Sequence, residues 1–294
     1  MSEFNDEPID IVVPWVNPND SVWRKEFEYW KKKETGNKDA CRYRDWGFIK
    51  FVLRSIEENC PWCRYVFLVL SGPSQIPDWL NIENPKLKII FHKDYIPEEF
   101  LPTFNSNVIE LFYSNIKELS ENFILINDDM FFCQKKNEDF FFKNNIPVIF
   151  KKPQKFYNDR WSKTLINSRN LANKILNKND SFMFSGIHLP ICYKKSLQQF
   201  IFTKIDLSFM KNNKFRKEND LTHFLYLDIQ GKTGNCIINN TPRGINQPIR
   251  QQQSYLFNYP MICINENEFS TDIGCKLAVK SLSLKFNKKS SFEK

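Results

Sequence analysis

The stretch Glu121–Phe132 (ENFILINDDMFF) constrains the fold of this chain more than any other. Its four consecutive apolar residues, Phe123–Ile126, are bounded by polar ones, which is typical of a strand buried on both faces. The run stops at Asn127, Asp128 and Asp129, so two acids lie at the carboxyl end of the expected strand. In open α/β sheets this is the edge at which ligands bind.

The two adjacent acids allow two interpretations. Neighbouring carboxylates repel each other unless a cation or a proton neutralises them, and hard divalent cations take oxygen ligands. Asp128 and Asp129 therefore fit a Mg²⁺ or Mn²⁺ site that holds a diphosphate. An Asn-Asp-Asp sequence is also ordinary turn chemistry, and these residues alone do not decide between a metal site and a turn.

The pattern of apolar residues predicts an α/β fold with a largely parallel sheet, because buried strands alternate with amphipathic helices over short joins. Besides the central strand, strands are expected at Asp10–Val16, Tyr65–Leu70 and Leu87–Phe91. Helices are expected at Val22–Lys33, from Phe48 to Ile56, from Asn105 or Ser106 to Leu119, and at Leu165–Leu176, Lys195–Phe202 and Asp220–Leu227. We expect one domain, residues 1–294, in which 1–150 form the α/β core and 151–294 are helical or irregular.

Charge and composition narrow the class of partner. A formal charge of +8 favours phosphates, a nucleotide or an acidic membrane surface. No basic stripe with interleaved aromatic residues is present, so nucleic acid is not an expected partner. The acidic start and the lack of a run of ~18 apolar residues predict a cytoplasmic protein. The basic end, Lys276–Lys294, is expected to be a solvated tail or a peripheral contact with the inner face of the membrane.

The eight cysteines are expected to be reduced thiols, because no secretory signal precedes them. Cys60 and Cys63 have redox or half-zinc spacing, yet no second such pair exists, which favours packing around Trp62.

Two further residues, Arg44 and His188, have the chemistry of an anion or proton-transfer site. Arg44 lies at the start of an expected helix, which Asp45 can cap. Arg44 fits either a contact with a phosphate or a surface ion pair. His188 lies in a loop between Gly186 and Pro190, outside any periodic apolar run, which favours a side chain presented into a cleft.

Several blocks of the sequence, taken together, resemble one known family. They are Ile9–Asn17 (IDIVVPWVN), Arg42–Trp62 (RYRD with LRSIEENCPW), Pro77–Asn81 (PDWLN), Leu101–Glu110 (LPTFNSNVIE), the central ENFILINDDMFF, and more loosely LINSRNLANKIL, GIHLP, KFRKENDLTHF, CINEN and SSFE. In this order they resemble the conserved blocks of the Stealth family of phosphotransferases. That family includes bacterial capsular-polysaccharide phosphotransferases and the animal enzyme that tags lysosomal glycoproteins with N-acetylglucosamine phosphate.

The resemblance implies a Rossmann-like, glycosyltransferase-A-like sheet and a set of site residues. It puts Asp128 and Asp129 at the metal and diphosphate and His188 at the reacting centre. The other implied residues are Arg169 and Arg216 on the phosphates, and Asn17, Arg44, Asp45, Asn105, Ser106 and Asp220 at the substrate. The chain departs from the family pattern at Trp46-Gly47, Ser71–Gln75 and Glu266, which bears on sugar specificity more than on the reaction.

The implied reaction passes hexose-1-phosphate, expected to be N-acetylglucosamine-1-phosphate, from a UDP-sugar to a hydroxyl of an acceptor glycan and releases UMP. His188 is the first candidate for the base, and an Asp of the central pair is the second. The alternative is a metal-dependent glycosyltransferase that transfers the sugar and releases UDP. A non-catalytic carbohydrate-binding protein would need neither the metal nor His188. The oligomeric state is not predicted.

Overall fold

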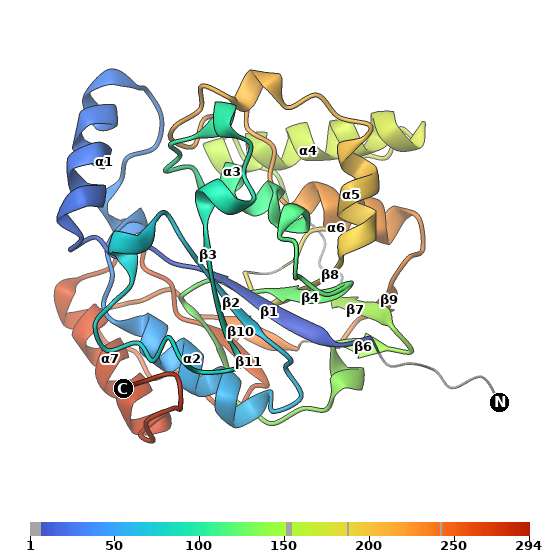
Figure 1. Ribbon diagram of the computed structural model, residues 1–294. Helices are drawn as coiled ribbons and strands as arrows, with labels where there is room; N and C mark the ends of the chain where they lie inside the picture. Colours follow the sequence, from blue (N-terminus) through green and yellow to red (C-terminus); the bar gives the residue numbers. More distant parts are fainter. Residues whose placement is uncertain (1–6, 151–154, 187, 242) are drawn as a thin grey trace.

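The structure is a computed structural model that describes residues 7–150, 155–186, 188–241 and 243–294 (Figure 1). Its strands are β1 (Ile9–Pro14), β2 (Val66–Leu70), β3 (Leu87–Phe91), β4 (Asn122–Leu125), β5 (Met130–Phe132), β6 (Phe142–Lys143), β7 (Ile146–Phe150), β8 (Ile191–Lys194), β9 (Ile237–Asn239), β10 (Gly244–Asn246) and β11 (Met261–Cys263). Its α-helices are α1 (Ser21–Lys33), α2 (Phe48–Asn59), α3 (Ser106–Leu111), α4 (Arg160–Leu176), α5 (Lys195–Phe202), α6 (Phe224–Lys232) and α7 (Asp272–Lys285).

A five-stranded sheet in the order β3-β2-β1-β4-β8 forms the centre. β1 is parallel to both β2 and β4, with Ile11 opposite Val66 on one side and Ile124 on the other. β3 is also parallel, and only β8 runs antiparallel, beside β4. The prediction of an α/β fold with a largely parallel sheet is therefore confirmed.

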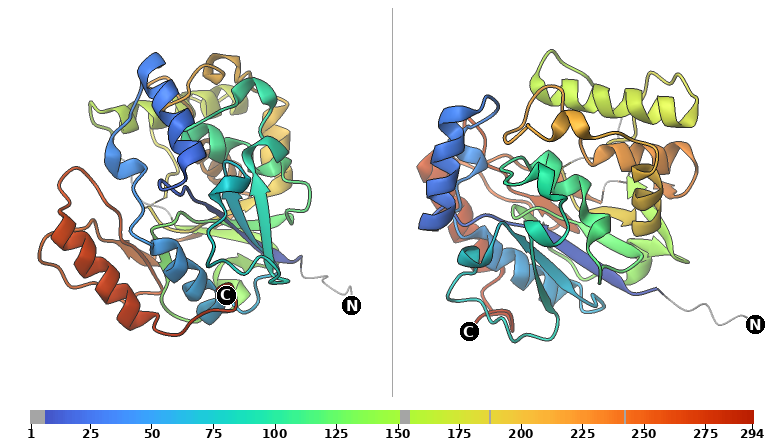
Figure 2. Two further views of the ribbon diagram at one scale, coloured as in Figure 1. Left: turned by 60° about the vertical axis from the view of Figure 1, so that its left-hand side comes forward. Right: turned by 45° about the horizontal axis from the view of Figure 1, so that its top comes forward.

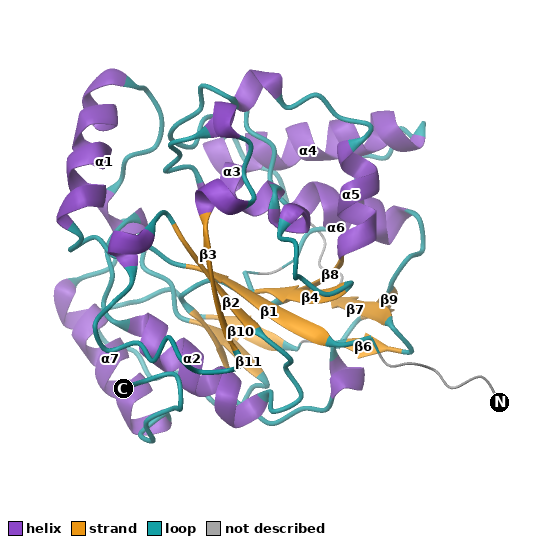
Figure 3. Ribbon diagram, viewed as in Figure 1, coloured by secondary structure: helices purple, strands orange, loops and turns teal. Residues whose placement is uncertain are grey.

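Helices cover both faces of this sheet, as the purple and orange elements of Figure 3 show. α2 and α7 lie on one face, and α3, α4, α5 and α6 lie on the other (Figures 1 and 2). Successive side chains of β1 point to opposite faces of the sheet. Ile11 and Val13 belong to the core on the α2 side, and Val12 belongs to the core on the other side. All three side chains are fully buried, which explains why the strands are apolar runs.

Two smaller sheets connect distant parts of the chain. β5 pairs antiparallel with β11, and β11 pairs with β10. β7 pairs with β6 and with β9. The first of these sheets matters most for the site, because it brings the residues after β11 to the turn that follows β4.

The predicted elements are largely present, with shifted ends. β3 and α5 match the expected bounds, and α4 begins five residues earlier than expected, at Arg160. The helix expected to reach Leu119 is wrong in length, because α3 ends at Leu111 and a 3₁₀ turn follows. Asp220 does not start α6, since its carboxylate is held by neighbouring amides and the helix begins at Phe224.

The expectation of a solvated tail at Lys276–Lys294 is wrong. Its first half belongs to α7, and Phe292 is only 2% exposed. Arg54 of α2 donates from Nε and Nη2 to both carboxylate oxygens of Glu293, each at 2.8 Å, and Lys294 N donates to Trp79 O. All eight cysteines are free thiols.

Candidate active site

A cavity of about 500 Å³ opens beside the carboxyl end of β4. It is lined by residues 41, 42, 44–46 and 48 before and at the start of α2, by α3, by the turn 127–129, by the starts of α4 and α6, and by residues 186, 188, 216, 246 and 264–266. In the central sheet β2 and β3 lie on one side of β1, and the next strand, β4, lies on its other side, so the strand order reverses between β1 and β4. Ligands of open α/β sheets bind at such a point.

The turn after β4 is held from both sides. Met130 N donates to Asn127 O at 3.1 Å, and Ile264 N donates to Asp129 O at 2.9 Å. The second bond exists because β11 runs beside β5. Asn127, Asp128 and Asp129 therefore do form a turn, and all three line the cavity.

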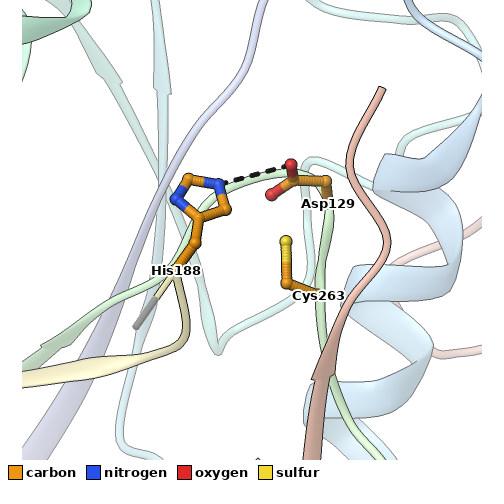
Figure 4. Close-up of side chains that lie close together, drawn as sticks. All are labelled: Asp129, His188 and Cys263. Atoms are coloured by element: carbon orange, nitrogen blue, oxygen red, sulfur yellow. Dashed lines mark ion pairs between the residues drawn. The ribbon is translucent and has the colours of Figure 1, made fainter. Parts of the chain in front are cut away.

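Asp129, His188 and Cys263 lie together at this turn (Figure 4). Asp129 Oδ2 is 3.4 Å from His188 Nε2, and one potential ligand atom from each of the three residues lies within 4.8 Å of the others. Burial raises the pKa of the Cys263 thiol well above its usual value, and Asp129 raises it further. Cys263 is therefore a neutral thiol, which is a poor ligand compared with a thiolate.

The carboxylates of the site repel one another. Burial raises the pKa of Asp128 well above its usual value, and the nearby charges of Asp129 and Asp45 add to this. Burial also raises the pKa of Asp45, although its bond from Gly47 N acts in the other direction. Three acids in one cavity wall create a local demand for positive charge.

The same carboxylate charges favour the protonated form of His188 and so raise its pKa. Burial lowers its pKa, but the carboxylates of Asp129 and Glu110 together outweigh burial, so the net pKa is raised above the usual imidazole value. Its side chain remains 38% exposed, which leaves it accessible from the cavity. Pocket access and a carboxylate neighbour are the features of a general base.

Three buried oxygen atoms of the cavity wall have no hydrogen-bond partner in the described part of the chain. They are Oδ1 of Asp129, of Asn246 and of Asn265. Buried polar atoms are nearly always paired, so these three oxygens are open to water, an ion or a ligand in the cavity. Carboxylate and amide oxygens are the ligands that Mg²⁺ and Mn²⁺ prefer.

Two predicted arginines reach the cavity. Arg216 donates through its guanidinium to Ser106 Oγ and has no acidic side chain at ion-pair distance among the described residues. Arg44 does have partners, since it pairs with Glu266 and, at 3.6 Å, with Asp272. The ion-pair interpretation of Arg44 is thus confirmed. Arg44 also lines the cavity, and its contact with a phosphate stays a prediction.

Arg169 does not line the cavity, so its expected contact with the phosphates is a correction. Its Nη1 donates to Ser181 O at 2.8 Å, and its guanidinium lies 5.0 Å from the centre of the Phe156 ring. These contacts hold the guanidinium against residues that do not line the cavity. Asn17 is also placed elsewhere, because it exchanges hydrogen bonds with Gln75.

Asn105, Ser106 and Asp220 lie behind the cavity wall rather than in it. Asn105 caps α3 by accepting from Asn107 N and also donates to Asp220 at 2.8 Å. Asp220 further accepts from Asn107 Nδ2 at 3.1 Å. These residues fix the positions of Asn107 and Arg216, which do line the cavity. Asp45 lines it too but does not cap α2, whose N-cap is Gly47.

Glu110 and His223 are site residues that sequence reasoning missed. Both line the cavity, with Glu110 Oε2 3.5 Å from His223 Nε2. Burial raises the pKa of Glu110 to about 7, against the opposing charges of Arg216 and His188. Burial lowers the pKa of His223 to about 3. The available signal was the spacing of Asn107 and Glu110, which puts both on one face of α3.

Comparison with known proteins agrees with the resemblance in the sequence. Residues 42–150 match Stealth protein CR2, conserved region 2. The capsular polysaccharide phosphotransferase WcwK of Streptococcus pneumoniae is 33% identical, and the match covers 99% of each chain. The exopolysaccharide phosphotransferase cps2G of Lactiplantibacillus plantarum is 30% identical over 97% of this chain and 96% of its own. The capsular polysaccharide phosphotransferase fcs1 of Haemophilus influenzae is 35% identical over 73% and 62%.

Proposed function

Because the chain belongs to the Stealth family of sugar-phosphate transferases, we propose that it builds phosphodiester links in a capsular or other cell-surface polysaccharide. In this proposal it moves hexose-1-phosphate, with N-acetylglucosamine-1-phosphate as the expected group, from a UDP-sugar to a hydroxyl of an acceptor glycan and releases UMP. The observation that supports it is that Asp128, Asp129, His188 and Arg216 line one and the same cavity.

The donor diphosphate fits the basic side of the cavity. Arg216 is a permanently charged group without an ion-pair partner among the described residues, and a guanidinium offers forked donors to phosphate oxygens. The cavity is lined by Arg44 and by Phe48 in the first turn of α2, and the positive end of a helix dipole favours an anion there. A Rossmann-like, glycosyltransferase-A-like sheet is part of the proposal and is supported by the parallel order β3-β2-β1-β4.

The residues present fit Mg²⁺ or Mn²⁺. The unpaired oxygens of Asp129, Asn246 and Asn265 and the carboxylate of Asp128 would hold the ion. When bound, such an ion neutralises the adjacent acids and draws charge from the oxygens of the diphosphate. The chain's own contribution is to keep the turn 127–129 in place through the bonds to Met130 and Ile264.

His188 is the proposed base. The acceptor hydroxyl attacks the phosphorus bonded to the sugar, a new oxygen–phosphorus bond forms, and the bond to the UMP oxygen breaks. His188 takes the acceptor proton, while Asp129 orients the imidazole and stabilises its charged form. The bond between the anomeric carbon and its oxygen is not cut, so the configuration of the sugar is kept. Glu110, with a pKa of about 7, is a further candidate for the base beside the Asp of the central pair.

The test is a donor labelled in the β-phosphate, incubated with Mg²⁺ and an acceptor glycan, using a panel of UDP-sugars. Sugar-phosphate transfer puts the label on the glycan and yields UMP. A glycosyltransferase would leave the label in UDP, which would refute the proposed reaction. A carbohydrate-binding protein would release neither nucleotide.

A nucleotide-sugar donor also supports a cytoplasmic site of action, with the glycan acceptor at the inner face of the membrane. Among the described residues, no helix combines the length and apolarity needed to span a bilayer. Any membrane contact of these residues would therefore be peripheral, and the basic segment in α7 is the candidate for it.

A further inference from the structure

The outward side of α7 carries three exposed apolar side chains. Ile273 is 57% exposed, Leu277 is 39% exposed and Leu284 is 71% exposed. The inner side of the same helix is buried against the protein through Cys275, Ala278 and Leu282, and Figures 1 and 2 show α7 at the periphery of the molecule beside α2. The outward side chains are thus not part of any core in the described structure.

These three residues form one stripe. With about 100° of rotation per residue in an α-helix, they fall within about 40° of one another. Lys276 and Lys280 are exposed and lie within about 60° of Ile273 on the same side. Apolar and cationic side chains therefore share one face about 14 residues long.

Within the chain segment that carries the stripe, all charged residues have one sign. Residues 273–292 contain five lysines, at 276, 280, 285, 288 and 289, and no acid. The two acids that flank this segment are already paired, Asp272 with Arg44 and Glu293 with Arg54. The face is therefore complementary to an anionic surface.

We propose that the outward face of α7 docks on an anionic membrane surface. A helix that lies in the membrane interface inserts a narrow row of apolar side chains, while its lysines reach the headgroups. A protein partner fits less well, because lysine is depleted at the cores of protein interfaces and three separated side chains cover too little area.

The position of α7 connects this contact to the cavity. Asp272, the first residue of the helix, lies 3.6 Å from Arg44, which lines the cavity. A molecule docked through α7 holds its cavity close to the bilayer. If the proposed function is right, the acceptor is then a glycan carried on a membrane lipid, although the docking itself does not depend on that reaction.

The test is flotation of the full chain, without substrate, on vesicles of phosphatidylcholine alone or mixed with phosphatidylglycerol. The wild type is expected to float with the anionic vesicles only and to be released by salt. Leu277→Ser with Leu284→Ser should weaken binding about tenfold or more. Lys276→Gln with Lys280→Gln should weaken it about 30-fold.

Matched controls are Val22→Ser with Phe200→Ser, which removes equally exposed apolar side chains from other elements, and Lys31→Gln with Lys32→Gln on α1. Both should float like the wild type, and every variant should keep the wild-type circular dichroism and activity on a soluble acceptor. Three results would overturn the proposal. They are a wild type that stays with the buffer, α7 variants that float unchanged, and a dimer in light scattering that the Leu variants abolish without any vesicle binding.

Discussion

Arg216 and Arg169 were both expected to bind the phosphates, but their surroundings differ, so each serves as a control for the other. The guanidinium of Arg216 lines the cavity and has no acidic partner among the described residues, whereas Arg169 is bound to Ser181 outside the cavity. We expect Arg216→Lys to be nearly as harmful as Arg216→Ala, with a loss of about 2–4 kcal/mol in transition-state stabilisation, because an ammonium cannot reproduce the fork. Arg169→Lys should leave kcat/KM within about threefold of wild type. Steady-state kinetics of the three variants decide the matter, and equal losses at both positions would contradict it.

His188 should affect the chemical step and not donor binding. We expect His188→Ala to lower kcat about 10²–10⁴-fold with little change in the Kd of the donor. A base must be neutral to act, and Asp129 raises the pKa of His188, so the acidic limb of the wild-type profile should fall above pH 6.5.

The control for His188 is His92→Gln, since His92 is buried beyond β3 and outside the cavity. Its profile should match the wild type. If the acidic limb survives in His188→Ala with an apparent pKa of about 7, Glu110 is the base instead.

Asp129 should matter for metal binding and for the stability of the metal-free protein in opposite ways. Asp129→Asn is expected to abolish most turnover, because it removes a ligand and the partner of His188. In excess chelator, however, its Tm should equal or exceed that of wild type, since the repulsion with Asp128 is relieved. Mg²⁺ should raise the Tm of wild type only. Full wild-type activity in chelator would refute the metal assignment.

At the scale of elements, the start of α2 depends on one backbone conformation. Gly47 has φ +78° as the N-cap, and a Cβ there would meet no atom within 4 Å. Gly47→Ala should therefore cost about 1–2 kcal/mol through backbone strain alone. Gly72 is also uncrowded but extended, with φ −175°, so Gly72→Ala should change stability by less than about 0.5 kcal/mol. Urea unfolding of both variants tests the difference.

Elements with a strong local signal were predictable, and elements that depend on distant partners were not. β2, β3 and β4 are recognisable in the sequence as largely apolar runs, and the apolar residues of α5 recur with the spacing of a helix. β8 pairs with β4 from some 70 residues away, and nothing in Ile191–Lys194 itself identifies that partner. For the same reason Asp128 and Asp129 were found from the end of a strand, while Glu110 depends on the packing of α3 for its place in the cavity.

At the scale of the whole molecule, the pair between Arg54 and Glu293 fastens the last residues to α2. Arg54 and Glu293 are 18% and 6% exposed, whereas Lys163 and Glu218 are 42% and 56% exposed at the same 2.8 Å. We expect Glu293→Gln to lower the free energy of unfolding by about 1–3 kcal/mol at pH 7. Glu218→Gln should cost less than about 1 kcal/mol.

Lowering the pH should remove the stability that the pair between Arg54 and Glu293 contributes. Burial acts to raise the pKa of Glu293, but the bonds from Arg54 and Ser290 together outweigh it and lower this pKa from 4.5 to about 2. A lowered carboxyl pKa stabilises the fold above the unfolded pKa, so this stability should be lost as the pH falls from about 4.5 to 2. Unfolding measured across that window should be flatter for Glu293→Gln than for wild type, and identical slopes would contradict the assignment.

The cavity takes its walls from residues 41 to 266, and this has a consequence for how the protein is made. Ribosomes release the amino-terminal strands first, so β4 emerges with one edge bare until β8 arrives, and the turn 127–129 lacks its bond from Ile264 until β11 has been synthesised. A bare edge of a buried strand is a site for aggregation. Nascent chains halted between β4 and β8 should therefore be the ones that chaperones retain, and no fragment that ends before Glu266 should bind donor.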